Sequence, residues 1–129
     1  MLLVEDEEEV RAFARRTLEQ CGYTVIAAAG GVEALALAHR STTRIAVLVT
    51  DIVMPRMTGP QLVERFIAAH PAPSVVYMSG YADDSIMRLE IDHGTSFIRK
   101  PFTPYTLART VRDALDATRR TPDVLSPVD

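Results

Sequence analysis

The sequence predicts a single α/β domain in which a parallel sheet is covered by helices on both faces. Short apolar runs of strand length alternate along the chain with stretches whose apolar residues recur at helical spacing. The runs lack the alternation of apolar and polar residues that marks a half-exposed strand, so we expect both faces to be buried. The 129 residues suffice for one domain, and 47% hydrophobic with 24% charged residues is an ordinary globular balance.

The expected strands are short runs that are mostly apolar, several of them rich in β-branched side chains that favour strands. They lie at residues 2–4, 23–28, 45–49, 74–78 and 96–98. The run at 23–28 is the weakest of them. The run at 45–49 is unusual because an acid, Asp51, follows it almost at once. A carboxylate there loses hydration unless another group satisfies it.

The expected helices lie between and after the strands, at residues 7–21, 32–39, 58–70, 83–94 and 103–117. In the first helix the apolar and small residues follow i, i+3, i+4 spacing and predict one buried stripe of Val10, Phe13, Ala14, Thr17, Leu18 and Cys21. Gly22 stands where a glycine ends a helix. In the third helix Pro60 lies near the first position, Pro71 ends it, and Leu62, Phe66 and Ile67 are expected to be buried.

The fifth helix is expected to begin with Thr103 as its N-cap and Pro104 in its first turn. After it, the segment RRTPDVLSPVD holds two prolines and no periodicity. We therefore expect a domain over residues 1–118 and a tail or linker over residues 119–129. Strands that alternate with helices in this way form a parallel sheet through right-handed crossovers.

Composition excludes several functional classes. The net charge of −3 gives no electrostatic reason to expect nucleic acid or an anionic membrane as a partner. The single cysteine, Cys21, excludes an internal disulfide and a cysteine-based zinc site. No apolar run approaches the roughly 20 residues that span a bilayer, and the start MLLVEDEEEV is not a signal peptide. We expect a cytoplasmic domain without membrane insertion.

Polar residues follow four of the expected strands. Glu5 and Asp6 follow the first, Asp51 the third, Ser79 the fourth and Lys100 the fifth. In an open parallel sheet, ligands bind outside the carboxyl ends of the strands. If these strands are neighbours, the three acids, the hydroxyl and the lysine share one pocket.

The charges limit what such a pocket binds. Two carboxylates about 5 Å apart repel by roughly 3 kcal/mol at an effective dielectric constant near 20, and Lys100 alone offsets only part of that. Mg²⁺, or Mn²⁺ in its place, offsets far more and leaves coordination positions for phosphate oxygens. An aspartate beside it can act as a nucleophile and form an aspartyl-phosphate.

The segments LLVEDE (2–7), VTDIVMPRMTG (49–59), YMSGY (77–81) and FIRKPF (97–102) resemble the receiver domain of two-component response regulators and hybrid sensor kinases. The resemblance covers about residues 2–118. It implies a flavodoxin-like (βα)5 fold with strand order 2-1-3-4-5. The first acid is Glu5 where aspartate is commoner, Ser79 replaces the commoner threonine, and Phe97 has no hydroxyl where many relatives carry tyrosine.

The resemblance also implies a role for each site residue. Asp51 is the expected phosphoacceptor. Asp6 is expected to bind Mg²⁺ directly and Glu5 through water, with Asp51 and the backbone carbonyl of Val53 as the other members of the metal site. Lys100 is expected to bind phosphate, with a cis bond to Pro101. Ser79 and Phe97 are expected to act as the switch pair.

The function so implied is a phosphoacceptor switch that takes its phosphoryl group from a sensor histidine kinase or a histidine phosphotransfer domain. Phosphorylation would reshape the face formed by the fourth helix, fifth strand and fifth helix, through which a homodimer is also allowed. Such a domain promotes its own phosphorylation but turns over no external substrate, so it is not an enzyme. The segments SGYADD and RKPFTPYTLARTVRDAL resemble receivers of hybrid sensor histidine kinases, and the first strand starts without the usual leader. We expect a piece of such a kinase, with a stand-alone receiver as the alternative.

Three other functions are weaker. A metal-dependent phosphohydrolase that forms an aspartyl-phosphate, similar to the haloacid dehalogenase group, would carry a second aspartate at position 53, where this chain has valine. A flavodoxin-like electron carrier would need paired aromatic residues in its loops to sandwich a flavin, and the expected loops lack them. A degenerate receiver that only binds partners would lack an acid or the lysine, and this chain keeps them.

Overall fold

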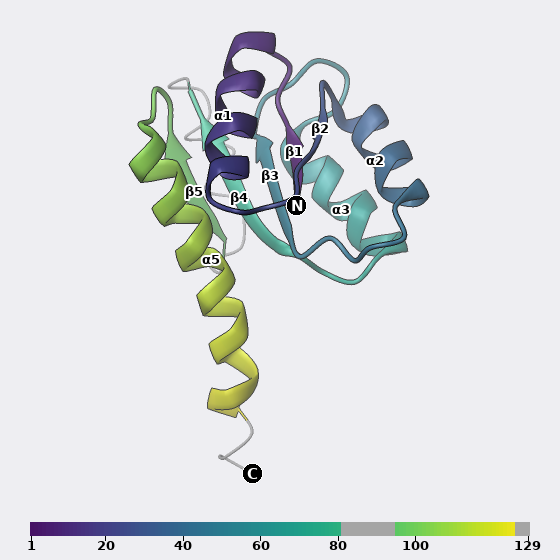
Figure 1. Ribbon diagram of the computed structural model, residues 1–129. Helices are drawn as coiled ribbons and strands as arrows, with labels where there is room; N and C mark the ends of the chain where they lie inside the picture. The colour runs from purple at the N-terminus through teal and green to yellow at the C-terminus, as the bar shows by residue number, and fades with distance from the viewer. Residues whose placement is uncertain (81–94, 126–129) are drawn as a thin grey trace.

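The computed structural model describes residues 1–80 and 95–125, and for residues 118–125 the backbone alone. Within these residues the chain forms a parallel sheet in the order β2-β1-β3-β4-β5 (Figure 1), which confirms the predicted fold class and strand order. The five strands are β1 (Leu2–Val4), β2 (Ile26–Ala28), β3 (Val47–Asp51), β4 (Ser74–Ser79) and β5 (Ser96–Arg99). The described helices are α1 (Glu8–Gln20), α2 (Gly31–Arg40), α3 (Gly59–Ala69) and α5 (Pro104–Leu125).

Helices cover both faces of the sheet (Figure 1). Leu3 on β1 belongs to a core shared with α1 and α5, where Leu18 and Leu107 are fully buried. Leu2 belongs to a second core shared with α2 and α3, which includes Phe66. Alternate residues of one strand thus enter two different cores, which explains why the strand sequences show no polar alternation.

The helix ends follow the expected signals. Gly22 adopts φ +96°, the left-handed conformation expected after the end of α1. The Thr58 hydroxyl accepts a hydrogen bond from the amide of Gln61, whose side chain accepts one from the amide of Thr58, so a capping box begins α3. The Thr103 hydroxyl accepts from the amide of Thr106, which confirms Thr103 as the N-cap of α5.

Some details of burial were predicted wrongly. Ile67 was expected to be buried, but its side chain is 47% exposed. It follows Phe66 directly, and one residue along a helix turns by about 100°, so the two cannot both face the sheet. In α1 the buried stripe is Ala14, Thr17 and Leu18, whereas Phe13 and Cys21 are exposed at its margin.

The last helix runs further than expected. Its backbone is helical to Leu125, although residues 119–129 were expected to form a tail. No glycine or proline stands between residue 117 and Pro122 to end it at residue 118, and the helix also includes Pro122. The domain boundary at residue 118 remains a prediction, and the expected helix at 83–94 lies outside the described residues. None of the described helices is both long enough and apolar enough to cross a bilayer.

Candidate functional site

The strand order brings the predicted site residues to one edge of the sheet. β1 pairs with β3, β3 with β4, and β4 with β5, so the carboxyl ends of these strands lie next to one another. Glu5 and Asp6 follow β1, and Asp51 is the last residue of β3. Ser79 ends β4, and Lys100 follows β5. The four strands are therefore neighbours, as the predicted shared pocket requires.

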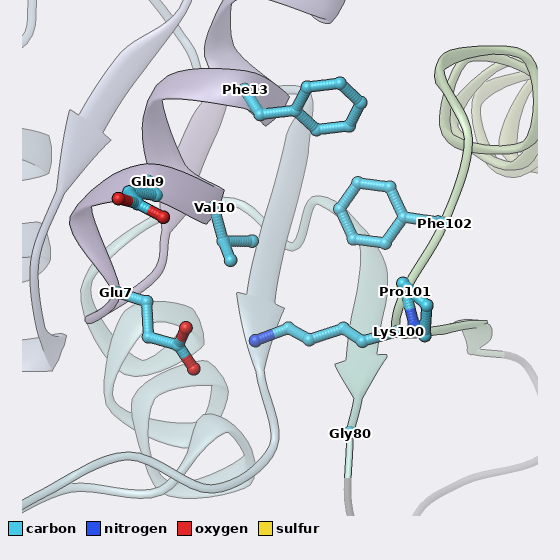
Figure 2. A pocket seen from close by; sticks show the side chains of 8 residues that line it. All are labelled: Glu7, Glu9, Val10, Phe13, Gly80, Lys100, Pro101 and Phe102. Atoms are coloured by element: carbon cyan, nitrogen blue, oxygen red, sulfur yellow. The ribbon is translucent and has the colours of Figure 1, made fainter.

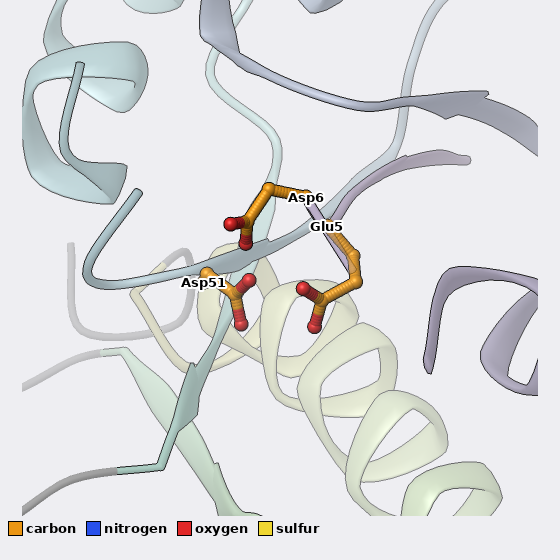
Figure 3. Close-up of side chains that lie close together, drawn as sticks. All are labelled: Glu5, Asp6 and Asp51. Atoms are coloured by element: carbon orange, nitrogen blue, oxygen red, sulfur yellow. The ribbon is translucent and has the colours of Figure 1, made fainter. Parts of the chain in front are cut away.

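Three acids form a cluster at this edge (Figure 3). Glu5, Asp6 and Asp51 each offer a carboxylate oxygen, and these oxygens lie within 4.8 Å of one another. Glu5 is fully buried and Asp51 is 3% exposed, whereas Asp6 faces solvent. The cluster is therefore open on the side of Asp6 and closed on the side of Glu5.

Lys100 enters the same cluster from β5. Its ammonium nitrogen lies 2.5 Å from Glu5 Oε1 and 2.6 Å from Asp51 Oδ1. The Lys100 amide donates a hydrogen bond of 2.9 Å to the carbonyl of Ser79, which ties the end of β5 to the end of β4. The Lys100–Pro101 bond is cis, as the resemblance implied. One lysine thus contacts two buried acids.

Burial and the shared lysine perturb all three groups. Burial raises the pKa of Asp51 to about 9, and hydrogen bonding to Glu5 reinforces the shift although Lys100 opposes it. Burial alone would raise the pKa of Glu5, but hydrogen bonds with Asp51, Lys100 and the Glu7 amide outweigh it and lower that pKa. Burial would likewise lower the pKa of Lys100, and its contacts with Asp51 and Glu5 raise it instead. The single ammonium of Lys100 therefore does not keep both Glu5 and Asp51 ionised at neutral pH.

A hard divalent cation fits this arrangement. Asp51 Oδ2 is buried and has no hydrogen-bond partner among the described residues. The available ligands are carboxylate oxygens, which Mg²⁺ prefers, and the open side at Asp6 leaves room for water and phosphate oxygens. An acidic triad of this kind is typical of the magnesium site of receiver domains.

The loop after Asp51 is held close to the start of α3. The Gly59 amide donates a hydrogen bond of 2.8 Å to the carbonyl of Ile52. A Cβ atom at position 59 would lie 2.2 Å from the backbone oxygen of Asp51, so only glycine allows this approach. Val53 lies in the same loop, and its side chain is 46% exposed.

The predicted switch residues lie on the two neighbouring strands β4 and β5. Ser79 is 5% exposed at the end of β4. Phe97 on β5 is half-buried, and its ring stacks on that of Tyr77 on β4 with 5.7 Å between the centroids. Ser79 thus adjoins Lys100, whose amide donates to its carbonyl, whereas Phe97 lies three residues earlier on β5. The roles of both residues remain predictions.

Sequence reasoning missed a cavity of about 430 Å³ next to Lys100. Figure 2 shows the ring of Phe13 on α1 facing that of Phe102, with acidic side chains from the start of α1 nearby. The two ring centroids lie 6.0 Å apart. The other lining residues are Glu7, Glu9, Val10, Gly80, Lys100 and Pro101. A phenylalanine at the margin of the α1 stripe was the signal that could have indicated this cavity.

Sequence reasoning also missed Arg11. Its guanidinium Nη1 donates a hydrogen bond of 2.9 Å to the backbone carbonyl of Glu5. Because the acceptor is a main-chain atom, no pairing of residue types in the sequence could have revealed it.

Comparison with known proteins gives a consistent result. Residues 1–112 match the family described as "Response regulator receiver domain". The chain is 42% identical over 117 residues to the sensor kinase CckA of Brucella abortus, which covers 90% of this chain and 12% of that protein. It is 31% identical over 120 residues to the C4-dicarboxylate transport transcriptional regulatory protein DctD of Rhizobium meliloti, covering 92% and 26%.

A similar structure has also been solved. The crystal structure of the receiver domain from the hybrid histidine kinase CckA superimposes with a TM-score of 0.74 at 36% identity, covering 88% of this chain and 96% of that one. The chain thus spans a small part of the two curated relatives but nearly all of this solved receiver domain.

Proposed function

Because this chain belongs to the response regulator receiver domain family, we propose that it is a phosphoacceptor switch in which Asp51 receives a phosphoryl group from a phosphohistidine of a partner protein. The observation that carries the proposal is the convergence of Glu5, Asp6 and Lys100 on a buried aspartate with an unpartnered oxygen. A buried carboxylate oxygen without a hydrogen-bond partner is costly to retain, which favours a functional reason for it.

The transfer would proceed by nucleophilic attack of the Asp51 carboxylate on phosphorus. A new O–P bond forms, the P–N bond to the partner's imidazole breaks, and the imidazole nitrogen takes up a proton. Glu5, Asp6, Asp51 and the Val53 carbonyl would hold Mg²⁺, which when bound neutralises negative charge on the transferring group. Lys100 already reaches Asp51 Oδ1 and would pair with a phosphoryl oxygen after transfer.

Ser79 and Phe97 would convert the new charge into a change of shape. The Ser79 hydroxyl would donate a hydrogen bond to the phosphoryl group, and Phe97 would move inward against Tyr77, on which it already stacks. These two steps would shift the population between two packings of the face around β5 and α5. The helix expected at 83–94 would complete that face, and it lies outside the described residues.

The cavity beside Lys100 supports an approach of the partner from the side of α1. It combines the rings of Phe13 and Phe102 with the acidic side chains of Glu7 and Glu9 at the start of the helix. An apolar side chain flanked by lysine or arginine on the partner would match both features. The partner would be a histidine kinase or a histidine phosphotransfer domain.

We infer that the chain acts as a signalling module and not as an enzyme. Position 53, where a phosphohydrolase of the haloacid dehalogenase type needs an acid, carries an exposed aliphatic side chain. The similarity to the sensor kinase CckA favours a hybrid histidine kinase as the whole protein, with the receiver in the cytoplasm.

Incubation with a small phosphodonor tests the proposal. We expect the mass of the intact protein to rise by one phosphoryl group in Mg²⁺ and to stay unchanged in EDTA. Asp51→Asn should remove the gain, whereas Asp113→Asn on the exposed surface of α5 should not. Equal gains in wild type and Asp51→Asn, or no gain in wild type, would refute it.

A further inference from the structure

Arg11 contacts the main chain that precedes α1. It lies in the first turns of the helix, and its half-buried side chain runs back toward the helix N-terminus to the carbonyl of Glu5, 2.9 Å away. By contrast, Arg15 one turn later pairs with Glu19 farther along the helix.

This direction is electrostatically unfavourable for an arginine. The N-terminus of a helix carries a partial positive charge, which favours acids such as Glu8 and Glu9 and disfavours a guanidinium. A specific hydrogen bond must therefore offset the repulsion. The acceptor that it reaches is the main chain of the acid cluster.

The hydrogen bond fixes one particular peptide group. The Glu5 amide is held by the carbonyl of Ala28 at 3.1 Å, and the Glu5 side chain accepts from the Glu7 amide at 2.9 Å. Arg11 donates a hydrogen bond to the carbonyl of Glu5, which belongs to the peptide group between Glu5 and Asp6. A rotation of that peptide would change φ of Asp6 and swing its exposed carboxylate away from Asp51.

We propose that Arg11 is a positioning residue that holds the Asp6 carboxylate in place for a divalent cation, an inference that rests on the proposed function. Groups that orient metal ligands commonly change metal affinity by about 10–100-fold when they are replaced. A positioning role and a purely electrostatic role of Arg11 predict opposite changes in cation affinity when the residue is replaced. A guanidinium near the site repels Mg²⁺, so its removal would tighten binding if Arg11 did no more than carry charge.

The test measures cation affinity without phosphorylation. Free Mn²⁺ is counted by electron paramagnetic resonance during titration of the domain, and Mg²⁺ affinity is obtained by competition. The variants are Arg11→Gln, Arg11→Lys and the control Arg15→Gln, which removes the same charge from the same helix. Thermal unfolding in EDTA accompanies each titration.

We expect Arg11→Gln to raise the Kd for both cations about 10-fold, Arg11→Lys to raise it less, and Arg15→Gln to change it less than twofold. An unchanged or lower Kd in Arg11→Gln would overturn the inference. If Arg11→Gln does not fold, Arg11→Lys decides by the same criterion. Wild-type protein that binds neither cation would overturn the proposed function itself, and this inference with it.

Discussion

Replacement of Asp51 by asparagine is expected to stabilise the domain when Mg²⁺ is absent, although it removes an ion pair. The Lys100 ammonium at 2.6 Å attracts the Asp51 carboxylate by about 6 kcal/mol at an effective dielectric constant near 20. The Glu5 carboxylate, within 4.8 Å, repels it by at least about 3 kcal/mol, and solvent-exposed Asp6 adds a smaller repulsion.

The repulsions offset half or more of the attraction, so the desolvation of a buried carboxylate is compensated only in part. That cost is several kcal/mol for an ion in a protein interior, and Oδ2 has no described partner to reduce it. In Asp51→Asn, Lys100 keeps its contact with Glu5. We therefore expect the free energy of unfolding in EDTA at pH 7 to rise by about 1–3 kcal/mol, or about 3–10 °C in Tm.

The difference should depend on pH in a defined direction. The folded-state pKa of Asp51 is raised from 3.8 to about 9, so the folded wild type holds a proton that the unfolded chain has lost. Its contribution to stability is complete below pH 3.8 and is lost as the pH rises toward about 9. The advantage of Asp51→Asn should thus grow between pH 4 and pH 9. Saturating Mg²⁺ should reduce this difference in stability, because a ligand at about 100 times its Kd adds about 2.7 kcal/mol to the free energy of unfolding of wild type.

Urea unfolding followed by circular dichroism, in EDTA and in Mg²⁺, measures these quantities. The control is Asp113→Asn, which removes an exposed carboxylate and should change stability by less than about 0.5 kcal/mol. If Asp51→Asn proves less stable than wild type in EDTA at pH 8, the Asp51 charge stabilises the fold and the reasoning is wrong.

Three further substitutions test other parts of the site. Val53→Asn introduces an amide that can orient a water molecule two residues after Asp51, which the exposed valine cannot do. The phosphorylated form should therefore decay several-fold faster, as followed by mass spectra taken over time. Slower or equal decay would count against Val53 as a residue that shields the phosphoryl group from water. Tyr81, which with Val53 is expected to shield the phosphoryl group from attacking water, lies outside the described residues. Phe13→Ala opens the cavity beside Lys100 and should slow phosphotransfer from a cognate kinase without slowing reaction with a small phosphodonor. Ile67→Ala, on the exposed side of α3, should change neither rate, and an equal loss in both variants would exclude docking at the cavity. Lys100→Met leaves Glu5 and Asp51 buried without a cation and should lower the free energy of unfolding in EDTA by about 3–5 kcal/mol. Mg²⁺ should restore part of this loss. An unchanged free energy of unfolding in urea would show that the two ion pairs contribute nothing to stability.

The ends of the strands made much of the site predictable. Asp51 and Lys100 each stand at the carboxyl end of an apolar run, and a parallel sheet brings such ends to one edge whatever the loops do. The contacts within the cluster were not predictable in the same way. The sequence does not show that Lys100 bridges Glu5 and Asp51, since this depends on side-chain rotamers and burial.

Helical spacing predicted the cores only to within one residue. Phe66 and Ile67 are both apolar, and the pattern does not decide which of them faces the sheet. The contact of Arg11 with the carbonyl of Glu5, six residues earlier, depends on the conformation of one side chain and the loop before α1. The cavity that Phe13 and Phe102 line arises from the packing of segments far apart in the sequence. No local pattern records such packing.

The proposed function depends most on Asp51 as the nucleophile that attacks phosphorus. An aspartyl-phosphate can be reduced by borohydride to homoserine, which marks the modified position in a peptide map. After reaction with a small phosphodonor and Mg²⁺, we expect homoserine at position 51 and unmodified acids at positions 5 and 6. A reduced side chain at either of those positions, homoserine from Asp6 or the alcohol one carbon longer from Glu5, would show that another residue accepts the phosphoryl group, as would a phosphorylated protein with unaltered Asp51.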